Sequence, residues 1–422
     1  MRIITLLLMI LTAGAYGQSI IQGKITDATT QEPLPFATIA FKGTTTGTVS
    51  NAQGSFRLNL PDALPSDTLL ISYIGYESFS LSFAELQSPL NISLTPSVMQ
   101  LEELVILPLS PEEYLTKAVK KFKSNYAKDP FTTTAYYREV FTENRDYISF
   151  NEGVFYSSYP NYQDTLPNQH QLVLYRTASD KEEIDFMHQW VEDKTAKEKK
   201  KALKKGEAWE ESDETTREII QMGFGGPEQI LGMDLMKEIE YSLDSNQFKK
   251  FKYRFGKGLT YQSRDIIEIL FESKGQVDHQ RMEGVIYVDL ESDAIVSVAY
   301  TGELVVPVWA QPILFAFGLS IKDPIFSKSL KYQYHQGRWY PDTFQWDVAM
   351  GLKKRYLFKS NEYSDFTGHQ IFKVNDLIAN QTFEIDTALR FDPEKDPLKQ
   401  IHETPHIQWE RVNTLPLEVI QK

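Results

Sequence analysis

Hydrophobic and polar positions alternate in short runs over the first hundred residues. Segments 37–42 and 55–60 place apolar side chains at every second position, and 69–74 is an almost continuous apolar run that ends at Gly75. A period of two is typical of strands with one buried face, and turn residues separate the runs. We therefore expect an antiparallel β-sandwich over residues 18–97.

The same region carries residues that mark a known module. They are Gly23, Asp27, Pro33, Leu34, Ala37, Gly43, Gly54, Phe56, Ile74, Gly75 and Tyr76. The segment that contains them resembles the carboxypeptidase-regulatory-like domain, which occurs at the N-terminus of many exported proteins of Gram-negative bacteria. The resemblance implies a prealbumin-like sandwich of seven strands that serves as a structural or docking module.

A predicted linker over residues 98–110 leads to a helix start. Ser110 is suited to the N-cap, Pro111 to the first helical position and Glu113 to the third, a combination known as a capping box. An apolar stripe at helical spacing follows, formed by Tyr114, Leu115, Ala118, Val119, Phe122 and Tyr126. The sequence therefore predicts an amphipathic helix that packs on a sheet.

Strand patterns return after Pro130. They cover 135–141, 147–156, 266–271, 285–290, 295–300, 330–334 and 339–348, and segments 291–293 and 335–338 have the composition of hairpin turns. The chain is therefore predicted to be mainly β, with a larger α+β domain over 111–390 that contains a curved antiparallel sheet and packed helices. Residues 179–243 are expected to form a charged helical insertion, and 391–422 a C-terminal extension.

Two further resemblances concern this larger region. The order of one helix followed by long hairpins is similar to the half-barrel of the LolA/LolB lipoprotein-carrier proteins. Segments 110–122, 134–141, 225–236 and 409–420 resemble the periplasmic part of outer-membrane proteins that carry a regulatory-like domain. Both resemblances imply a protein of the bacterial cell envelope.

The beginning of the chain has the pattern of a signal peptide. Arg2 precedes an apolar run over 3–11, and Ala15 and Gly17 stand just before an expected cleavage point at Gln18. We therefore predict a cleavable leader over residues 1–17 and a protein that is periplasmic or associated with the outer membrane. The leader's apolar core is too short for a transmembrane helix. The sequence contains no cysteine, so we also expect no disulfide and no covalent lipid anchor.

Charge and motif content argue against several classes of function. The formal net charge is -13, and an acidic surface repels nucleic-acid phosphates, so we expect no nucleic-acid partner. His402 and His406 are four apart around Glu403, the spacing of a His-Glu-x-x-His motif, but Pro405 between them breaks the helix that would align two metal ligands. There is neither a Gly-x-Ser-x-Gly elbow nor a Walker-type phosphate loop. We therefore predict a non-enzyme with no catalytic residue, no metal site and no cofactor.

Segment 304–321 (LVVPVWAQPILFAFGLSI) is the main candidate for a binding surface. Pro307, Gln311 and Pro312 argue against a membrane-spanning helix. The candidate residues for an apolar ligand or partner surface are Trp309, Ile313, Leu314, Phe315 and Phe317. They could line a lipid-binding cavity, press on a membrane or partner, or fill the concave side of the sheet as ordinary core.

Three functions are compatible with these patterns. The first is a binding or assembly role at the outer membrane, through a docking sandwich and without catalysis, with an envelope protein or a lipid as partner. The second is a periplasmic carrier of lipids or lipoproteins with a half-barrel cavity. The third is a hydrolase whose site is built from residues far apart in sequence.

Overall fold

The computed structural model describes residues 20–60, 66–97, 109–162, 166–179, 199–201, 203–205, 225–237, 239–306, 311–316, 318–356, 360–381, 384–402 and 407–416. The expected signal peptide, most of the linker and most of the helical insertion lie outside these residues. Within them the chain is mainly β, which confirms the predicted fold class. None of the described helices is both long enough and apolar enough to cross a membrane.

The N-terminal part is a sandwich of seven strands, as predicted. The strands are β1 (Ile20–Asp27), β2 (Thr38–Phe41), β3 (Gly47–Val49), β4 (Ser55–Asn59), β5 (Thr68–Ser72), β6 (Phe79–Ser82) and β7 (Leu90–Leu94). They form a sheet of order β4-β1-β7 and a second sheet of order β3-β2-β5-β6. Alternation buries Ile39, Phe41, Phe56 and Leu58 between the two sheets.

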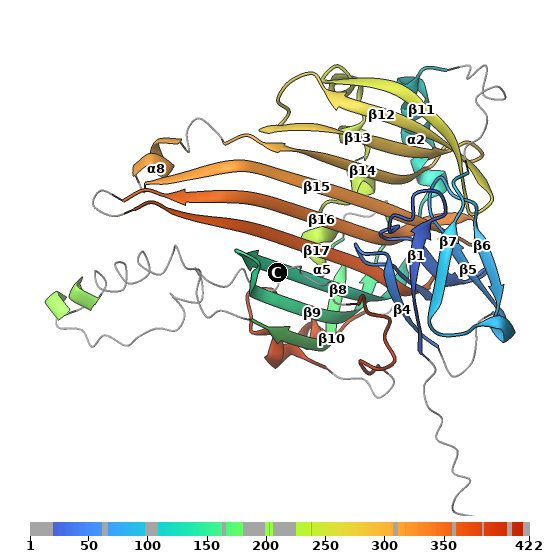
Figure 1. Cartoon of the computed structure of the whole chain (residues 1–422), viewed down its shortest axis with the longest axis horizontal. Helices are drawn as coiled ribbons and strands as arrows, with labels where there is room; N and C mark the ends of the chain where they lie inside the picture. Colours follow the sequence, from blue (N-terminus) through green and yellow to red (C-terminus); the bar gives the residue numbers. More distant parts are fainter. Residues whose placement is uncertain are drawn as a thin grey trace, which may run out of the picture.

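The larger part is built on one antiparallel sheet of ten strands (Figure 1). They are β8 (Phe131–Glu143), β9 (Asp146–Tyr159), β10 (Gln169–Ala178), β11 (Phe251–Tyr261), β12 (Arg264–Ser273), β13 (Gln280–Asp289), β14 (Ile295–Leu304), β15 (Leu319–His335), β16 (Arg338–Lys354) and β17 (Glu362–Ile378). Their order is β10-β9-β8-β17-β16-β15-β14-β13-β12-β11, so the last strand in sequence pairs with β8.

Helices cover one face of this sheet, which we call the inner face. They are α2 (Pro111–Asn125), α5 (Gly226–Leu231), α6 (Ile239–Ser242) and α7 (Ser245–Phe248), whereas α8 (Gln311–Ala316) lies at the far end of β15. The predicted capping box starts α2: the Glu113 carboxylate accepts from the Ser110 amide at 2.6 Å, and the Ser110 hydroxyl accepts from the Glu113 amide at 3.3 Å. The predicted stripe faces the sheet and is largely buried.

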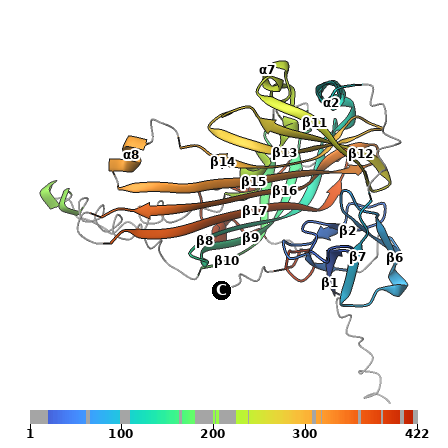
Figure 2. The same ribbon diagram turned by 45° about the horizontal axis from the view of Figure 1, so that its top comes forward.

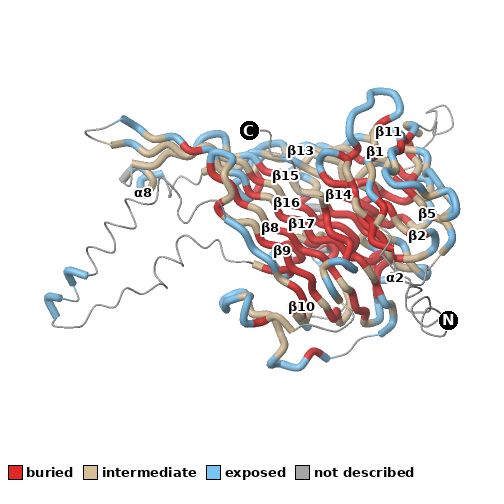
Figure 3. The backbone as a smooth tube through the Cα atoms, turned by 60° about the horizontal axis from the view of Figure 1, so that its bottom comes forward, coloured by how far each residue is buried: buried red, intermediate tan, exposed pale blue. Residues whose placement is uncertain are grey.

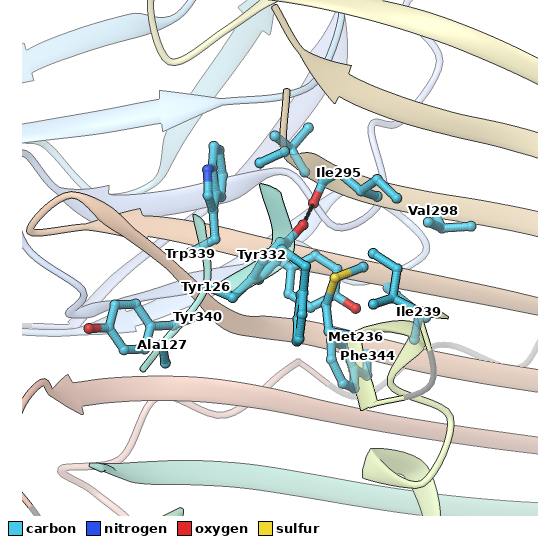
Figure 4. Packing of buried hydrophobic residues seen from close by; sticks show 14 of the residues in the cluster. Tyr126, Ala127, Met236, Ile239, Ile295, Val298, Tyr332, Trp339, Tyr340 and Phe344 are labelled. Atoms are coloured by element: carbon cyan, nitrogen blue, oxygen red, sulfur yellow. Dashed lines mark hydrogen bonds between the residues drawn. The ribbon is translucent and has the colours of Figure 1, made fainter. Parts of the chain in front are cut away.

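The core between the helices and the inner face is rich in aromatic side chains (Figure 4). The Tyr126 hydroxyl donates to the carbonyl of Ile295, and the Tyr126 ring meets the Tyr332 ring edge-on with centroids 5.6 Å apart. Trp339 and Phe344 are also fully buried in this cluster. Such rings bury large areas and pair with defined geometry, so they fix how the helices lie on the sheet.

The sandwich rests on the opposite face, which we call the outer face, near one end of the strands (Figures 1 and 2). A small apolar cluster joins the parts, with Val49 from the sandwich packed beside Tyr136 and Ile371 of the sheet. At the edge strand β11, the Gly75 amide donates to the Thr260 carbonyl at 3.2 Å. Buried residues concentrate in the middle of the sheet, and exposed ones at the end that carries α8 (Figure 3).

Seven strands of the large sheet and its two hairpin turns agree with the prediction. The predicted runs lie in β8, β9, β12, β13, β14, β15 and β16, and the predicted turns join β13 to β14 and β15 to β16. The sequence patterns did not reveal β10, β11 and β17. The first residues of β15 also come from the segment that was singled out as a binding surface.

Candidate functional site

The end of the sheet remote from the sandwich is an arm of three strands. Beyond the last pair between β14 and β15, Glu303–Ile325, the strands β15, β16 and β17 continue without other neighbours on the β14 side. Leu319 pairs with Lys354, and Lys354 with Glu362, near the tip. We call residues 311–325, 349–356 and 360–365 the arm, in so far as the structure describes them; α8 lies at its end (Figure 1).

The predicted surface residues that the structure describes lie at this tip. Phe315 in α8 is 75% exposed, and Leu314 beside it is half-buried. Trp309 and Phe317 lie outside the described residues, and Ile313 is described only as part of the α8 backbone. The exposure of Phe315 argues against the interpretation that this side chain fills the concave side of the sheet.

Cations and aromatic rings lie side by side on the arm. The Lys353 ammonium is 5.0 Å from the centre of the Tyr363 ring, and Tyr363 is 62% exposed. A hydrogen bond from Lys353 lowers the pKa of the Tyr363 hydroxyl, which is the direction expected beside a cation. The Tyr356 hydroxyl donates to Glu362 at 2.6 Å. These residues were not singled out from the sequence. The alternation of basic and aromatic residues in 353–363 could have pointed to them.

Cavities lie elsewhere on the molecule. One of about 840 Å³ on the outer face is bordered by Phe36 of the sandwich and crosses neighbouring strands from Glu283 of β13 to Asp347 of β16. A second, of about 480 Å³, lies beyond His369 of β17, which is hydrogen-bonded to Asp347. A third, of about 390 Å³, lies beside Glu228. None of these three cavities is lined by residues 304–321, which were candidates to line the lipid-binding cavity of a carrier.

One set of side chains has the order of a hydrolase triad. The Ser157 hydroxyl is 2.7 Å from Nδ1 of His170, and Nε2 of His170 is 3.1 Å from the Glu228 carboxylate. Burial opposes ionisation of Glu228, but its hydrogen bond with His170 and the charge of Lys237 outweigh burial and lower its pKa to about 2.

The same set lacks access for a substrate. Ser157 is fully buried in β9 and lines none of the three cavities described above. A nucleophile has to reach the atom that it attacks, so a buried hydrogen-bonded cluster explains this geometry better than a catalytic site. Among the described residues, no group of three or more His, Asp or Glu side chains is placed to hold a metal ion.

Ionic clusters fasten the sandwich to the outer face. The Lys331 ammonium donates to the Phe36 carbonyl at 3.2 Å and to the Thr38 hydroxyl at 2.7 Å, both in the sandwich. Asp342 is within 3.3 Å of Lys331 and also pairs with Lys373, and all three sheet residues are buried. Buried charges of this kind are tolerated only when they are paired and hydrogen-bonded, so the contact has one preferred geometry.

Residues 407–416, which we call the strap, lie between the sandwich and the sheet. The Asn413 side-chain oxygen accepts from the Asn59 amide at 2.7 Å, and its NH2 group donates to the Gly47 carbonyl at 3.1 Å. Its own carbonyl accepts from Asn375 of β17 at 2.9 Å. Asn413 therefore joins both sheets of the sandwich to the large sheet. In the sequence this segment was noted only for its resemblance to the periplasmic part of outer-membrane proteins, because a single irregular segment has no periodic pattern.

A second ionic cluster lies under the strap. Arg138 donates to Glu152 at 2.7 and 2.9 Å and to the carbonyl groups of Leu415 and Pro416 in the strap. Arg176 pairs with the same carboxylate and lies 4.4 Å from the centre of the Trp409 ring, which is a cation–π distance.

Comparison with known proteins identifies the N-terminal region. The family model of the CarboxypepD_reg-like domain matches residues 21–106, so this part of the chain is a CarboxypepD_reg-like domain and the resemblance seen in the sequence is confirmed. The TonB-dependent receptor SusC of Bacteroides thetaiotaomicron is 31% identical over 127 residues. That match covers 30% of this chain and 12% of the receptor.

Solved structures give only distant matches. A Bacteroides fragilis protein of unknown function, described as membrane-associated, matches over 85% of this chain and 98% of its own with 12% identity and a TM-score of 0.16. Lipovitellin matches over 62% of this chain and 26% of its own, with 8% identity and a TM-score of 0.25. TM-scores this low establish no common fold.

Proposed function

We propose that this chain is a non-catalytic protein of the bacterial cell envelope, associated with the outer membrane, that acts by binding and assembly. The observation that carries the proposal is the docking of a CarboxypepD_reg-like domain on the large sheet through buried ion pairs and the strap. Because the buried ion pairs and the Asn413 hydrogen bonds involve the sandwich, the strap and the large sheet, they hold these three parts together and leave two separate ends for contact.

Two further observations support this function. The similarity to SusC, a TonB-dependent receptor, lies over the N-terminal region that contains the matched domain. The end of the sandwich remote from the sheet is exposed at β6, where Phe79 is 39% exposed on an edge strand. An edge strand offers unpaired backbone groups to a partner, so this is where the sandwich would dock.

Separation of envelope fractions and site-directed crosslinking test the proposal. We expect the tagged full chain to be recovered with outer membranes, and a photo-crosslinking amino acid at Phe79 to give a discrete adduct in living cells. The same group at Leu398, which is 60% exposed outside the sandwich, is the matched control and should give none.

Two results would contradict the proposal. One is recovery of the chain in the cytosol with no adduct at either position. The other is hydrolysis of an ester or peptide that Ser157→Ala abolishes while the variant keeps the unfolding midpoint of the wild type, because this would make the buried cluster a catalytic site.

A further inference from the structure

The tip of the arm has a composition unlike the rest of the chain. The described residues of the arm hold four basic and three acidic side chains, whereas the whole chain has a net charge of -13. The basic residues are Lys322, Lys353, Lys354 and Arg355, and the acidic ones are Asp323, Glu362 and Asp365. The arm therefore has a net charge of +1 on an acidic protein, and three of its cations, Lys322, Lys353 and Arg355, lie close enough to act on the Tyr363 hydroxyl.

Exposed apolar side chains lie among these cations. Phe315, Tyr363 and Ile325 are 75%, 62% and 49% exposed, which makes them three of the most exposed large apolar side chains among the described residues. Arg355 and Lys322 are exposed, and neither forms an ion pair within the described part of the chain. Exposed rings favour an apolar partner over water, and the exposed cations beside them favour an anion.

The backbone holds this set of side chains in place. The Arg355 amide donates to the Gly318 carbonyl at 2.8 Å, and the Gly318 amide donates to the Phe315 carbonyl at 2.9 Å, so α8 is tied to the end of β16. Gly318 has φ +67°, and a Cβ there would lie 2.8 Å from the Arg355 carbonyl oxygen. Phe315 and the cationic strand end are therefore presented together by a defined turn.

Charge decides between the possible occupants of this surface. A second copy of the chain would bring another basic tip, and like charges repel. A lipid layer with anionic headgroups offers phosphate groups for lysine and arginine and an apolar boundary for the rings, which is the environment where aromatic and basic side chains gather at membrane surfaces.

We propose that the tip of the arm is a docking surface for an anionic lipid layer, with Phe315 and Tyr363 at the headgroup boundary and Lys322, Lys353 and Arg355 facing lipid phosphates. The proposal rests on the envelope function above and names a partner for it. The tip and the sandwich lie at opposite ends of the large sheet, so a chain docked by its arm leaves β6 accessible (Figure 1).

Vesicle flotation with the purified full chain tests this surface. We expect binding to phosphatidylcholine vesicles that contain about one third phosphatidylglycerol, and little binding to phosphatidylcholine alone, because each cation near an anionic surface adds attraction. The double variant K353E/R355E should weaken the partition coefficient about 30-fold or more. Phe315→Ser should weaken it roughly tenfold, since one buried ring is lost from the lipid boundary.

Matched controls separate the surface from general charge and hydrophobicity. K24E/K42E reverses two exposed lysines of the sandwich, and Leu398→Ser removes an exposed apolar side chain outside the arm. Both controls should bind like the wild type. All variants change exposed side chains except at Lys353, which is half-buried, and an unchanged unfolding midpoint in urea confirms that each one folds.

The results distinguish this inference from the function on which it rests. Equal binding by K353E/R355E and K24E/K42E, or a dimer in light scattering that K353E/R355E dissociates, would overturn the lipid surface. If the chain binds no vesicle but is still recovered with outer membranes and crosslinks at Phe79, only the lipid inference fails. If it binds anionic vesicles through the arm but is absent from the envelope of cells, the proposed function fails and the lipid surface stands.

Discussion

The two faces of the ten-stranded sheet both bury carboxylates, but with different partners. On the outer face, burial opposes ionisation of Asp342, yet the charges of Lys373 and Lys331 outweigh burial and hold its pKa below the usual range. Glu152 follows the same balance, with Arg138 and Arg176 as its cations. The outer face therefore keeps its carboxylates ionised.

On the inner face, the buried carboxylates of Asp234 and Glu139 have neutral donors, whereas the half-exposed Glu228 has Lys237 as its cation. The Asp234 carboxylate accepts from the Tyr332 hydroxyl at 2.6 Å and the Tyr162 hydroxyl at 2.8 Å, but burial dominates and raises its pKa. The Glu139 carboxylate accepts from Tyr137 and from Gln370, both at 2.8 Å, and burial raises its pKa to about 7.

The difference explains what each face does. Charged pairs under the sandwich are satisfied in one arrangement of sandwich, strap and sheet, so they specify the docking geometry. Tyrosine hydroxyls on the inner face fix the helices through hydrogen bonds without adding cations to the core. The two faces should therefore respond in opposite ways to pH and to loss of a carboxylate.

The largest effect is expected from Asp342→Ala. It leaves two buried lysines without a counter-charge, and we expect a loss of about 3–5 kcal/mol in the free energy of unfolding. Asp347→Ala is the control on the same face, because the side chain of Asp347 is 35% exposed and pairs with His369. That change should cost about 1 kcal/mol or less. Equal losses in urea titrations of the two variants would show that the cluster under the sandwich is not special.

Glu139→Gln tests the inner face through pH. In the unfolded chain this carboxyl ionises near its ordinary pKa of 4.5, whereas in the folded protein it keeps its proton up to about pH 7. Glu139 therefore destabilises the folded state progressively as pH rises from about 4.5 to about 7, and above pH 7 this destabilisation stays constant. Removing the titration should stabilise the protein at pH 8 by about 3 kcal/mol and change little at pH 4.

Glu152→Gln is the matched control on the outer face. The pKa of Glu152 is lowered in the folded state, so its stabilisation is present above the ordinary pKa and is lost as pH falls through the folded value. This variant should be less stable than the wild type at neutral pH. Urea midpoints of both variants between pH 4 and pH 8 should diverge in opposite directions, and parallel profiles would remove the distinction between the faces.

The strap should contribute less than the ion pairs. Asn413→Ala removes hydrogen bonds to both sheets of the sandwich and leaves the buried Asn59 amide without its acceptor, so we expect a loss of about 2 kcal/mol. Hydrogen exchange should accelerate at Asn59. Asn91→Ala, an exposed change on β7, is the control and should leave exchange at Asn59 unchanged. The strap would be shown to be unimportant if both variants exchanged alike.

Local patterns predicted the sandwich, α2 and seven strands of the large sheet. Each of these has a period or a start signal that neighbouring residues carry by themselves, such as the Ser110 capping box. By contrast, β17 buries both Gln370 and Lys373, because helices cover one of its faces and the sandwich covers the other. A strand that is buried on both faces and has polar residues on each shows no alternation of apolar and polar positions, so its sequence does not reveal it.

The ionic clusters could not be predicted from local sequence patterns for another reason. Lys331, Asp342 and Lys373 come from three strands, and only the register of β15, β16 and β17 brings them together. Ser157, His170 and Glu228 likewise meet only in the fold. For the arm, the sequence singled out the apolar segment, but Lys353, Lys354 and Arg355 lie at the end of another strand, β16. Only the pairing of β15 with β16 shows that rings and charges share one tip.

The smallest effect is expected where the cations of an ion pair are exposed to water and only the carboxylate is buried. Lys117 and Lys121 of α2 lie 3.1 and 2.6 Å from Asp293 in the turn between β13 and β14, but their side chains are 43% and 46% exposed. Lys117→Ala should therefore cost less than about 1 kcal/mol, and the loss should shrink further in high salt. Lys120→Ala, an exposed lysine on the same helix, should cost nothing measurable. If urea titrations gave Lys117→Ala a loss close to that of Asp342→Ala, burial would not be what separates the docking clusters from ordinary surface pairs.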